Sequence, residues 1–149
     1  MSKDGISILN KKARFEYEFL DKYEAGIQLM GTEIKSLRLG NASIAEAYCA
    51  FENNELFLIN AHFAEFKYGN INNHEPLRKR KLLLHKRELS RLQHKLKDKG
   101  LTIVPIRVFQ SERGFAKIEI ALARGKKSFD KRQDIKKKDV ERELSRYRD

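Results

Sequence analysis

The chain changes character at one stretch, Ala123-Arg124-Gly125-Lys126-Lys127-Ser128-Phe129-Asp130-Lys131-Arg132. Before this stretch, apolar residues recur often enough to build a hydrophobic core. Residues 124–149 contain eleven basic residues, six acidic residues and only five apolar ones. The sequence therefore predicts a folded body over residues 1–125 and a basic tail over residues 126–149. Because a lone helix of this length is marginal in water, we expect the tail to be disordered when free and helical when bound.

The overall charge favours a polyanionic partner. The chain has 149 residues, a formal net charge of +11 and a sequence pI near 9.8. Such an excess points to nucleic acid first and to an anionic membrane second. No apolar run approaches the roughly 20 residues that cross a bilayer, and no signal peptide is recognisable. Cys49 is the only cysteine, so we expect a buried thiol, no internal disulfide and a cytoplasmic location.

Alternating polar and apolar residues predict several half-buried strands in the body. Residues 13–19 alternate, Asp21-Lys22 suits a turn, and 23–27 resumes extended structure. Residues 101–109 form another expected strand, with Pro105 at an edge or bulge. In residues 115–123, Ala116, Ile118, Ile120 and Leu122 are expected to face inward and Lys117 and Glu119 outward.

Turn and cap residues complete the expected elements. Residues 47–51 and 56–63 flank Glu52-Asn53-Asn54-Glu55, which suits a tight hairpin because asparagine tolerates positive φ. A short helix is expected over 31–40, with Thr32 as its cap and Gly40 in a left-handed conformation. A second helix is expected over 86–99, where Leu89, Leu92 and Leu96 share a face.

Together these elements predict a mainly β (α+β) body. A small closed antiparallel barrel with two to three flanking helices is favoured, because closure leaves no unpaired strand edges. The residues alone leave an open sheet with a helix on one face as the alternative.

Catalytic chemistry has little support in the pattern. The four histidines show no metal-ligand spacing, and one cysteine cannot form a thiolate zinc cage. We therefore expect no enzyme activity, no metal and no cofactor. The alternative of a magnesium-dependent nuclease would use Glu24 and Glu33, aided by Glu16 and Glu18.

Three basic groups favour RNA as the polyanion. They are Lys11-Lys12-Arg14, Arg78 to Lys81, and Arg124 to Lys138. Cationic side chains hold phosphates, whereas aromatic or planar groups stack on bases. By its position alone, Lys117 would be an ordinary surface residue.

Several short motifs resemble the SsrA-binding protein family, also called small protein B. They extend from about residue 10 to residue 138, and comprise Asn10-Lys11-Lys12-Ala13-Arg14, Tyr23-Glu24-Ala25-Gly26-Ile27, residues 31–40, Arg80-Lys81-Leu82-Leu83-Leu84-His85, residues 99–105, Gly125-Lys126-Lys127 and Asp130-Lys131-Arg132. The resemblance implies an oligonucleotide-binding-type barrel. It also implies an adaptor of trans-translation that binds the tRNA-like domain of transfer-messenger RNA (tmRNA) and delivers it to stalled 70S ribosomes, with elongation factor Tu and GTP as indirect partners. A permanent ribosomal protein remains an alternative.

The resemblance also implies site residues. Glu24, Leu83 and Lys117 match family positions important for RNA binding, and Phe129 stands where many relatives have histidine or tyrosine. The tail would occupy the empty mRNA channel and decoding centre. The expected RNA-binding set is Asn10, Lys11, Lys12, Arg14, Glu24, Arg38, Lys81, Leu83, Lys117, Lys126 and Lys127, and the expected decoding-centre set is Phe129, Asp130, Lys131, Arg132, Ile135 and Lys136.

Overall fold

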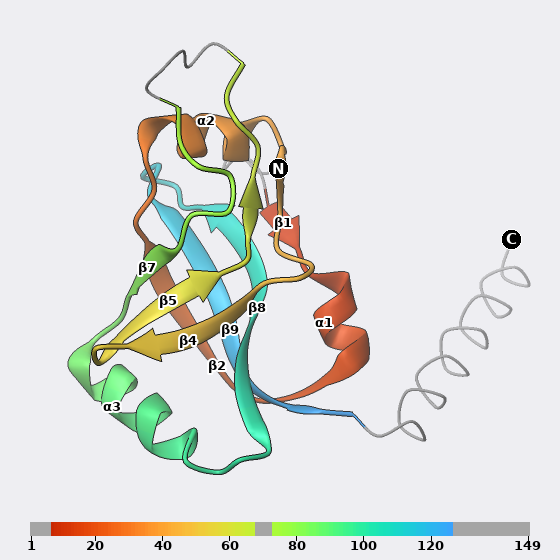
Figure 1. Ribbon diagram of the computed structural model, residues 1–149, viewed down its shortest axis with the longest axis vertical. Helices are drawn as coiled ribbons and strands as arrows, with labels where there is room; N and C mark the ends of the chain where they lie inside the picture. Colours follow the sequence, from red (N-terminus) through yellow and green to blue (C-terminus); the bar gives the residue numbers. More distant parts are fainter. Residues whose placement is uncertain (1–6, 68–72, 127–149) are drawn as a thin grey trace, which may run out of the picture.

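The body is a closed antiparallel β-barrel (Figure 1). The computed structural model of the chain describes residues 7–67 and 73–126. Strands β8, β4, β5, β7, β2 and β9 follow one another around the ring, and β9 pairs back with β8 to close it. The alternative of an open sheet is therefore wrong. The strands are β1 (Ser7–Leu9), β2 (Tyr17–Ile27), β3 (Ala42–Ser43), β4 (Tyr48–Glu52), β5 (Glu55–Ile59), β6 (His62–Phe63), β7 (Arg80–Leu83), β8 (Leu101–Gln110) and β9 (Ala116–Gly125).

Three helices flank the barrel in the described residues: α1 (Lys11–Glu16), α2 (Gly31–Arg38) and α3 (Lys86–Lys95). Figure 1 shows α2 and α3 at opposite ends of the barrel and α1 against its side. The short pair β3–β6 lies outside the ring. None of the helices in these residues is long and apolar enough to cross a membrane.

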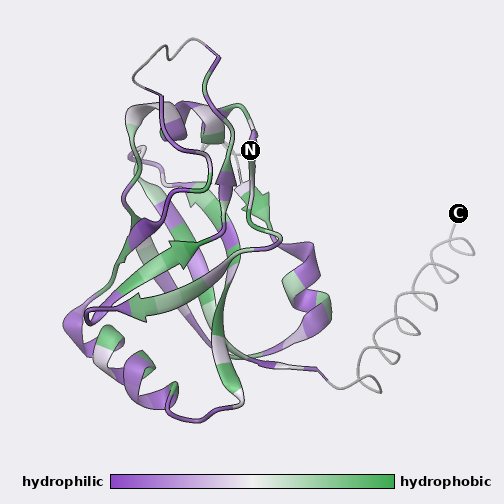
Figure 2. Ribbon diagram, viewed as in Figure 1, coloured by the Kyte–Doolittle hydropathy of each residue, from purple (hydrophilic) through white to green (hydrophobic). Residues whose placement is uncertain are grey.

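The expected alternation in β9 is confirmed. Ile118, Ile120 and Leu122 point into the main core, which also buries Cys49. Burial raises the pKa of the Cys49 thiol well above its ordinary value. Near the end of β9, the outward-facing residues are buried as well, because Ala121 and Ala123 pack under α1. Figure 2 shows the hydrophobic residues concentrated on the strands.

The expected strand over residues 13–19 is wrong in its first half, which forms α1. Asn10 is the reason. Its side chain accepts a hydrogen bond from the Ala13 N–H at 3.0 Å and so caps the helix. Its amide also donates to the carbonyls of Ile44 and Pro105 at 3.0 and 2.9 Å. These long-range bonds fix the start of α1, and local alternation could not reveal them.

The turn expected at Asp21-Lys22 is also wrong. β2 runs unbroken through these residues, and its register with β9 shifts between Phe19 and Asp21. Such an irregularity bends a strand without ending it. β8 has a similar shift between Pro105 and Arg107, which confirms the bulge expected at the proline.

Two expected turns are confirmed by their backbone angles. Asn53 and Asn54 have φ values of 52° and 64° and join β4 to β5 as a two-residue hairpin. Gly40 has a φ of 76° after α2. The strand expected over 56–63 is interrupted, because Asn60 takes a φ of 65° between β5 and β6.

The α2 cap differs from the expected one. The Met30 N–H donates to Glu33 Oε1 at 2.7 Å, whereas the Thr32 hydroxyl contacts His74 Nδ1 at 2.8 Å. α3 was expected to reach Lys99 but ends at Lys95, and a turn follows in which the Gly100 N–H donates to Asp98 at 3.1 Å.

A buried ion-pair network attaches α2 to the barrel. Glu33 and Arg80 are both fully buried, and Arg80 Nη2 lies 2.5 Å from Glu33 Oε2. Arg78 Nη2 contacts Glu33 Oε1 at 2.7 Å. Arg80 also donates to the carbonyls of Ala61 and Pro76 and lies over the Phe63 ring. Every charge in this network is therefore paired by other protein groups.

The network sets the charge state of Glu33. Burial alone would raise the pKa of this carboxyl, but hydrogen bonds from Arg78 and the Met30 N–H, together with the charges of Arg80 and Arg78, lower it below its ordinary value. Burial lowers the pKa of the Arg80 guanidinium, against the opposing effect of Glu33. The pair is therefore ionised near neutral pH.

Replacing Glu33 by Gln should destabilise the fold by about 3–5 kcal/mol, because it leaves the buried Arg80 charge without its carboxylate. Urea unfolding at pH 7 would measure this loss. The matched control is Lys79→Gln, which removes the exposed pair with Glu52 and should cost less than about 1 kcal/mol. Equal losses in the two variants would contradict a special role for the buried pair.

Acid should remove the advantage of the wild type over Glu33→Gln. Because the pKa of Glu33 in the folded state lies below the ordinary value of 4.5, the stabilisation is complete above pH 4.5. It is lost as the pH falls through the depressed pKa. Unfolding free energies of both proteins, measured from pH 7 downward, should converge at low pH. A difference that is independent of pH would show that the carboxylate charge is not its source.

Candidate nucleic-acid interface

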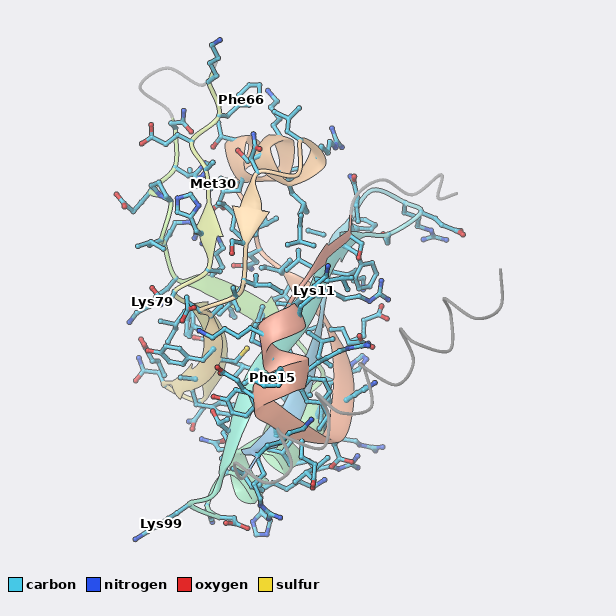
Figure 3. All side chains as sticks on the ribbon, turned by 90° about the vertical axis from the view of Figure 1, so that its right-hand side faces the viewer. Lys11, Phe15, Met30, Phe66, Lys79 and Lys99 are labelled. Carbon is cyan, nitrogen blue, oxygen red and sulfur yellow. The ribbon has the colours of Figure 1, made fainter. Side chains whose placement is uncertain are left out.

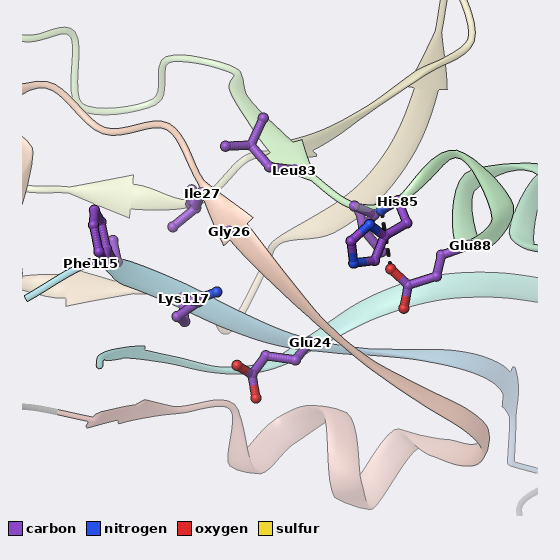
Figure 4. Close-up of a pocket in the computed structure, with 10 residues that line it drawn as sticks. Glu24, Gly26, Ile27, Leu83, His85, Glu88, Phe115 and Lys117 are labelled. Carbon is purple, nitrogen blue, oxygen red and sulfur yellow. Dashed lines mark hydrogen bonds between the residues drawn. The ribbon is translucent and has the colours of Figure 1, made fainter. Parts of the chain in front are cut away.

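A pocket of about 440 Å³ opens on the outer wall of the barrel, where β2, β7, β9 and the start of α3 meet (Figure 4). Its wall combines acidic, basic, apolar and aromatic side chains, which is the mixture needed to hold a nucleotide. The lining residues are Glu24, Gly26, Ile27, Leu83, Leu84, His85, Glu88, Phe115, Ala116 and Lys117.

Strand register creates the hollow. Gly26 pairs with Leu83 of β7 on one side and with Lys117 of β9 on the other. These three positions form one row across the sheet. The side chains of Leu83 and Lys117 therefore project on either side of Gly26, which has no side chain. A Cβ at Gly26 would lie 3.4 Å from the Leu83 Cβ and would begin to fill this space. Leu83 and Lys117 lie two strand spacings apart, which is about 10 Å and leaves room for a planar base between them.

Two of the three charged residues that line the pocket, Lys117 and Glu24, have no side-chain partner among the described residues, whereas Glu88 accepts a hydrogen bond from the His85 N–H. Neither Lys117 nor Glu24 forms an ion pair or a side-chain hydrogen bond with another residue in the described ranges. The neighbouring Glu119 is paired instead with Arg107 at 3.5 Å. The pocket therefore offers a ligand one cation, Lys117, and one carboxylate without a protein partner, Glu24.

Sequence reasoning missed Phe115 and His85, which also line the pocket. Phe115 is 63% exposed. A turn fixes its backbone: its carbonyl accepts from the Ser111 N–H at 2.8 Å, and its N–H donates to Ser111 Oγ at 3.1 Å. An aromatic residue directly after the Gly114 turn and two positions before Lys117 was the available signal. An exposed ring held in this way can stack on a base.

A second group of expected residues gathers around α1, and Figure 3 shows this helix facing the viewer. Lys11 and Arg14 are exposed, whereas Lys12 pairs with Glu46 at 2.6 Å. The hydrogen bond to Glu46 raises the pKa of Lys12. Lys126 joins this group, because its Nζ donates to the Arg14 carbonyl at 3.2 Å. The two ends of the folded body thus meet at one basic surface.

Asn10 contributes to that surface by positioning it. The residue is 4% exposed, and both its amide hydrogens and its carbonyl oxygen are used inside the protein. Its bonds hold the N-terminus of α1, from which Lys11 and Arg14 extend into solvent.

The remaining expected residues lie apart from these two groups or outside the described ranges. Arg38 is exposed at the end of α2. Lys81 lies two residues before Leu83 on the same face of β7 and pairs with Glu55. Lys127 and the whole decoding-centre set (Phe129, Asp130, Lys131, Arg132, Ile135 and Lys136) lie outside the described residues.

Within the basic group Arg78 to Lys81, Arg80 is buried and cannot face an RNA, which corrects its interpretation, whereas the role of the other members stays a prediction. Arg80 is buried and Arg78 is paired with the same Glu33. Lys79 pairs with Glu52 at 2.6 Å. Local sequence gave no hint that the acidic partners would lie on distant elements.

The nuclease alternative is also corrected. Both oxygens of Glu33 are held by arginines in a fully buried site, so this carboxylate cannot bind a metal together with Glu24. Within residues 7–67 and 73–126, no cluster of three or more His, Cys, Asp or Glu side chains is arranged to hold a metal ion.

The fold and the candidate site define a class, that of small closed β-barrel proteins with a basic surface suited to RNA. The model of the SmpB protein family matches residues 7–149, and the chain belongs to this family.

Curated relatives and a solved structure agree with this assignment. An SsrA-binding protein of Cytophaga hutchinsonii is 59% identical over 97% of this chain and 94% of its own length. Another, of Flavobacterium psychrophilum, is 54% identical over 96% of this chain and 95% of its own length. A chain solved under the description "tmRNA-SmpB: a journey to the center of the bacterial ribosome" superposes with a TM-score of 0.69 at 50% identity. The match covers 82% of this chain and 85% of that one.

Proposed function

We propose that this protein is the RNA-binding adaptor of trans-translation, which binds the tRNA-like domain of tmRNA and delivers it to stalled ribosomes. One observation carries the proposal: Glu24, Leu83 and Lys117, which come from three strands, line a single pocket on a strongly basic barrel. Membership of the SmpB family supports the same assignment.

The pocket has a chemical group for each part of a nucleotide. The unpaired Lys117 ammonium would neutralise a phosphate, and Glu24 would accept a hydrogen bond from an amine on a base edge. Phe115 would stack on the base, and Leu83 would contact its face or the sugar. This combination suits an unstacked nucleotide of a folded RNA loop rather than a continuous duplex.

The basic surface at α1 and the tail would serve the ribosome. Lys11, Arg14 and Lys126 lie where the chain leaves the barrel after β9. From this point residues 126–149 would extend along the empty mRNA channel, with Phe129 to Lys136 near the decoding centre. The resemblance of Asp130-Lys131-Arg132 to the family motif supports this division of labour.

The proposal extends to the cellular setting. We infer that the protein acts in the cytoplasm as a monomer without enzymatic activity, and that elongation factor Tu with GTP joins the complex through the RNA. Sequencing the RNA that copurifies with the tagged protein from bacterial lysate would test its main partner.

Substituting Lys117 or Glu24 by Ala should weaken binding to a transcript of the tRNA-like domain about tenfold, because each change removes a contact to a phosphate or base. Filter binding or fluorescence anisotropy would measure this effect. Phe115→Ala should also weaken binding, whereas Phe115→Tyr should retain most of it because the ring is kept.

The control for these variants is Lys79→Gln, which removes one positive charge that does not line the pocket. Unchanged melting temperatures would exclude unfolding. If Lys117→Ala and Glu24→Ala bound the transcript like the wild type, the pocket would be ordinary surface and the proposed site would be wrong.

Truncation before Phe129 should leave affinity for the tRNA-like domain nearly unchanged but abolish peptide tagging on stalled ribosomes, because the barrel retains the pocket while the channel-binding segment is lost. Binding assays and a reconstituted tagging assay would measure the two effects. Loss of RNA binding would contradict the division of labour. Retention of the full-length protein on ribosomes after a high-salt wash would favour a permanent ribosomal protein instead.

A further inference from the structure

The outward face of α3 carries a stripe of basic residues that none of the assigned residues includes. Arg87, Arg91 and His94 follow one another at spacings of four and three residues, so they lie on one side of the helix. All three are exposed. Leu92, on the opposite side, is fully buried in the core. The stripe therefore faces solvent along the whole helix.

The acidic residues near the stripe are occupied elsewhere. Residues 86–99 contain six Lys or Arg and only two acidic residues. Glu88 accepts a hydrogen bond from the His85 N–H at 3.1 Å, and Asp98 accepts from the Gly100 N–H and lies near Arg124. Among the described residues, no carboxylate pairs with Arg87 or Arg91. Two like charges four residues apart disfavour the helix, so the stripe is not explained by stability.

The stripe begins next to the pocket along the chain, because Arg87 directly precedes the pocket residue Glu88. Leu84, His85 and Glu88, at the start of α3, belong to the pocket wall, and Figure 4 shows the helix leading away from His85 and Glu88. Ten residues of helix extend about 15 Å. An RNA with one nucleotide in the pocket could therefore continue its backbone along α3.

We propose that Arg87, Arg91 and His94 form a phosphate-binding track for the same RNA whose nucleotide occupies the pocket. The proposal rests on the proposed function, since it requires an RNA at the pocket. The planar arginine fork matches phosphate oxygens. A protein partner fits less well, because the apolar residues Leu89 and Leu96 are packed against the core and leave no anchor on this face.

The test is the double substitution Arg87→Gln and Arg91→Gln in the full-length protein, with a transcript of the tRNA-like domain as the probe. Affinity should fall about tenfold, and the plot of log affinity against log salt should become shallower by about one to two units, because two phosphate contacts are lost. The matched control, Lys35→Gln with Lys79→Gln, removes the same charge from α2 and from the residue before β7, both outside the stripe, and should change both quantities much less.

The possible outcomes separate this proposal from the proposed function. If the double variant matches the wild type in affinity and salt slope while Lys117→Ala binds weakly, the track is wrong and the pocket stands. If the control variant weakens binding equally, net charge alone is responsible and the track is also wrong. Normal transcript binding with loss of ribosome binding would assign the stripe to ribosomal RNA and overturn the proposal. A wild type that does not bind the transcript would refute the proposed function itself.

Discussion

The double pairing of β9, with β2 on one side and β8 on the other, is the constraint on which the structure depends. It closes the ring, and the register shifts at Phe19/Asp21 and Pro105/Arg107 allow the two long partners to bend around it. Closure also sets the site. Lys117 stands beside Gly26 only in this register, and a slip of one residue would turn its side chain toward the core. The same hydrogen bonds that remove the strand edges therefore assemble the pocket.

Charge is distributed unevenly over the basic chain. Some cations are neutralised inside the protein, most completely Arg80, whose pairing with Glu33 attaches α2 to the barrel. Others, such as Lys12 with Glu46, form surface pairs that contribute little to stability. Lys117, Arg87 and Arg91 have no paired carboxylate among the described residues. Charges left without partners in a folded protein are the ones available to an RNA, so the net charge of +11 overstates the binding surface.

Local sequence predicted the elements whose chemistry is local. The asparagine hairpin at Asn53-Asn54, the bulge at Pro105 and the alternating core face of β9 all follow from backbone preference or from a period of two. The expectation failed at residues 13–16 because alternation over so few residues cannot distinguish a strand from a capped helix. It failed at Asp21-Lys22 because two consecutive polar residues resemble a turn, whereas in the bent strand Lys22 is exposed and Asp21 is half-buried and paired with Lys95 of α3. In both places, contacts with distant residues decide the conformation.

The sequence by itself determined a basic chain with a β-rich body, a charge-rich tail and motifs of one RNA-binding family. These are properties of composition and of short-range order, which a linear pattern records. The tertiary structure alone decided which charges are free, that Arg80 is buried on Glu33, and that Phe115 joins Glu24, Leu83 and Lys117 around Gly26. Each of these depends on strand register and ring closure between residues far apart in the chain, and no local pattern encodes which residues will become neighbours.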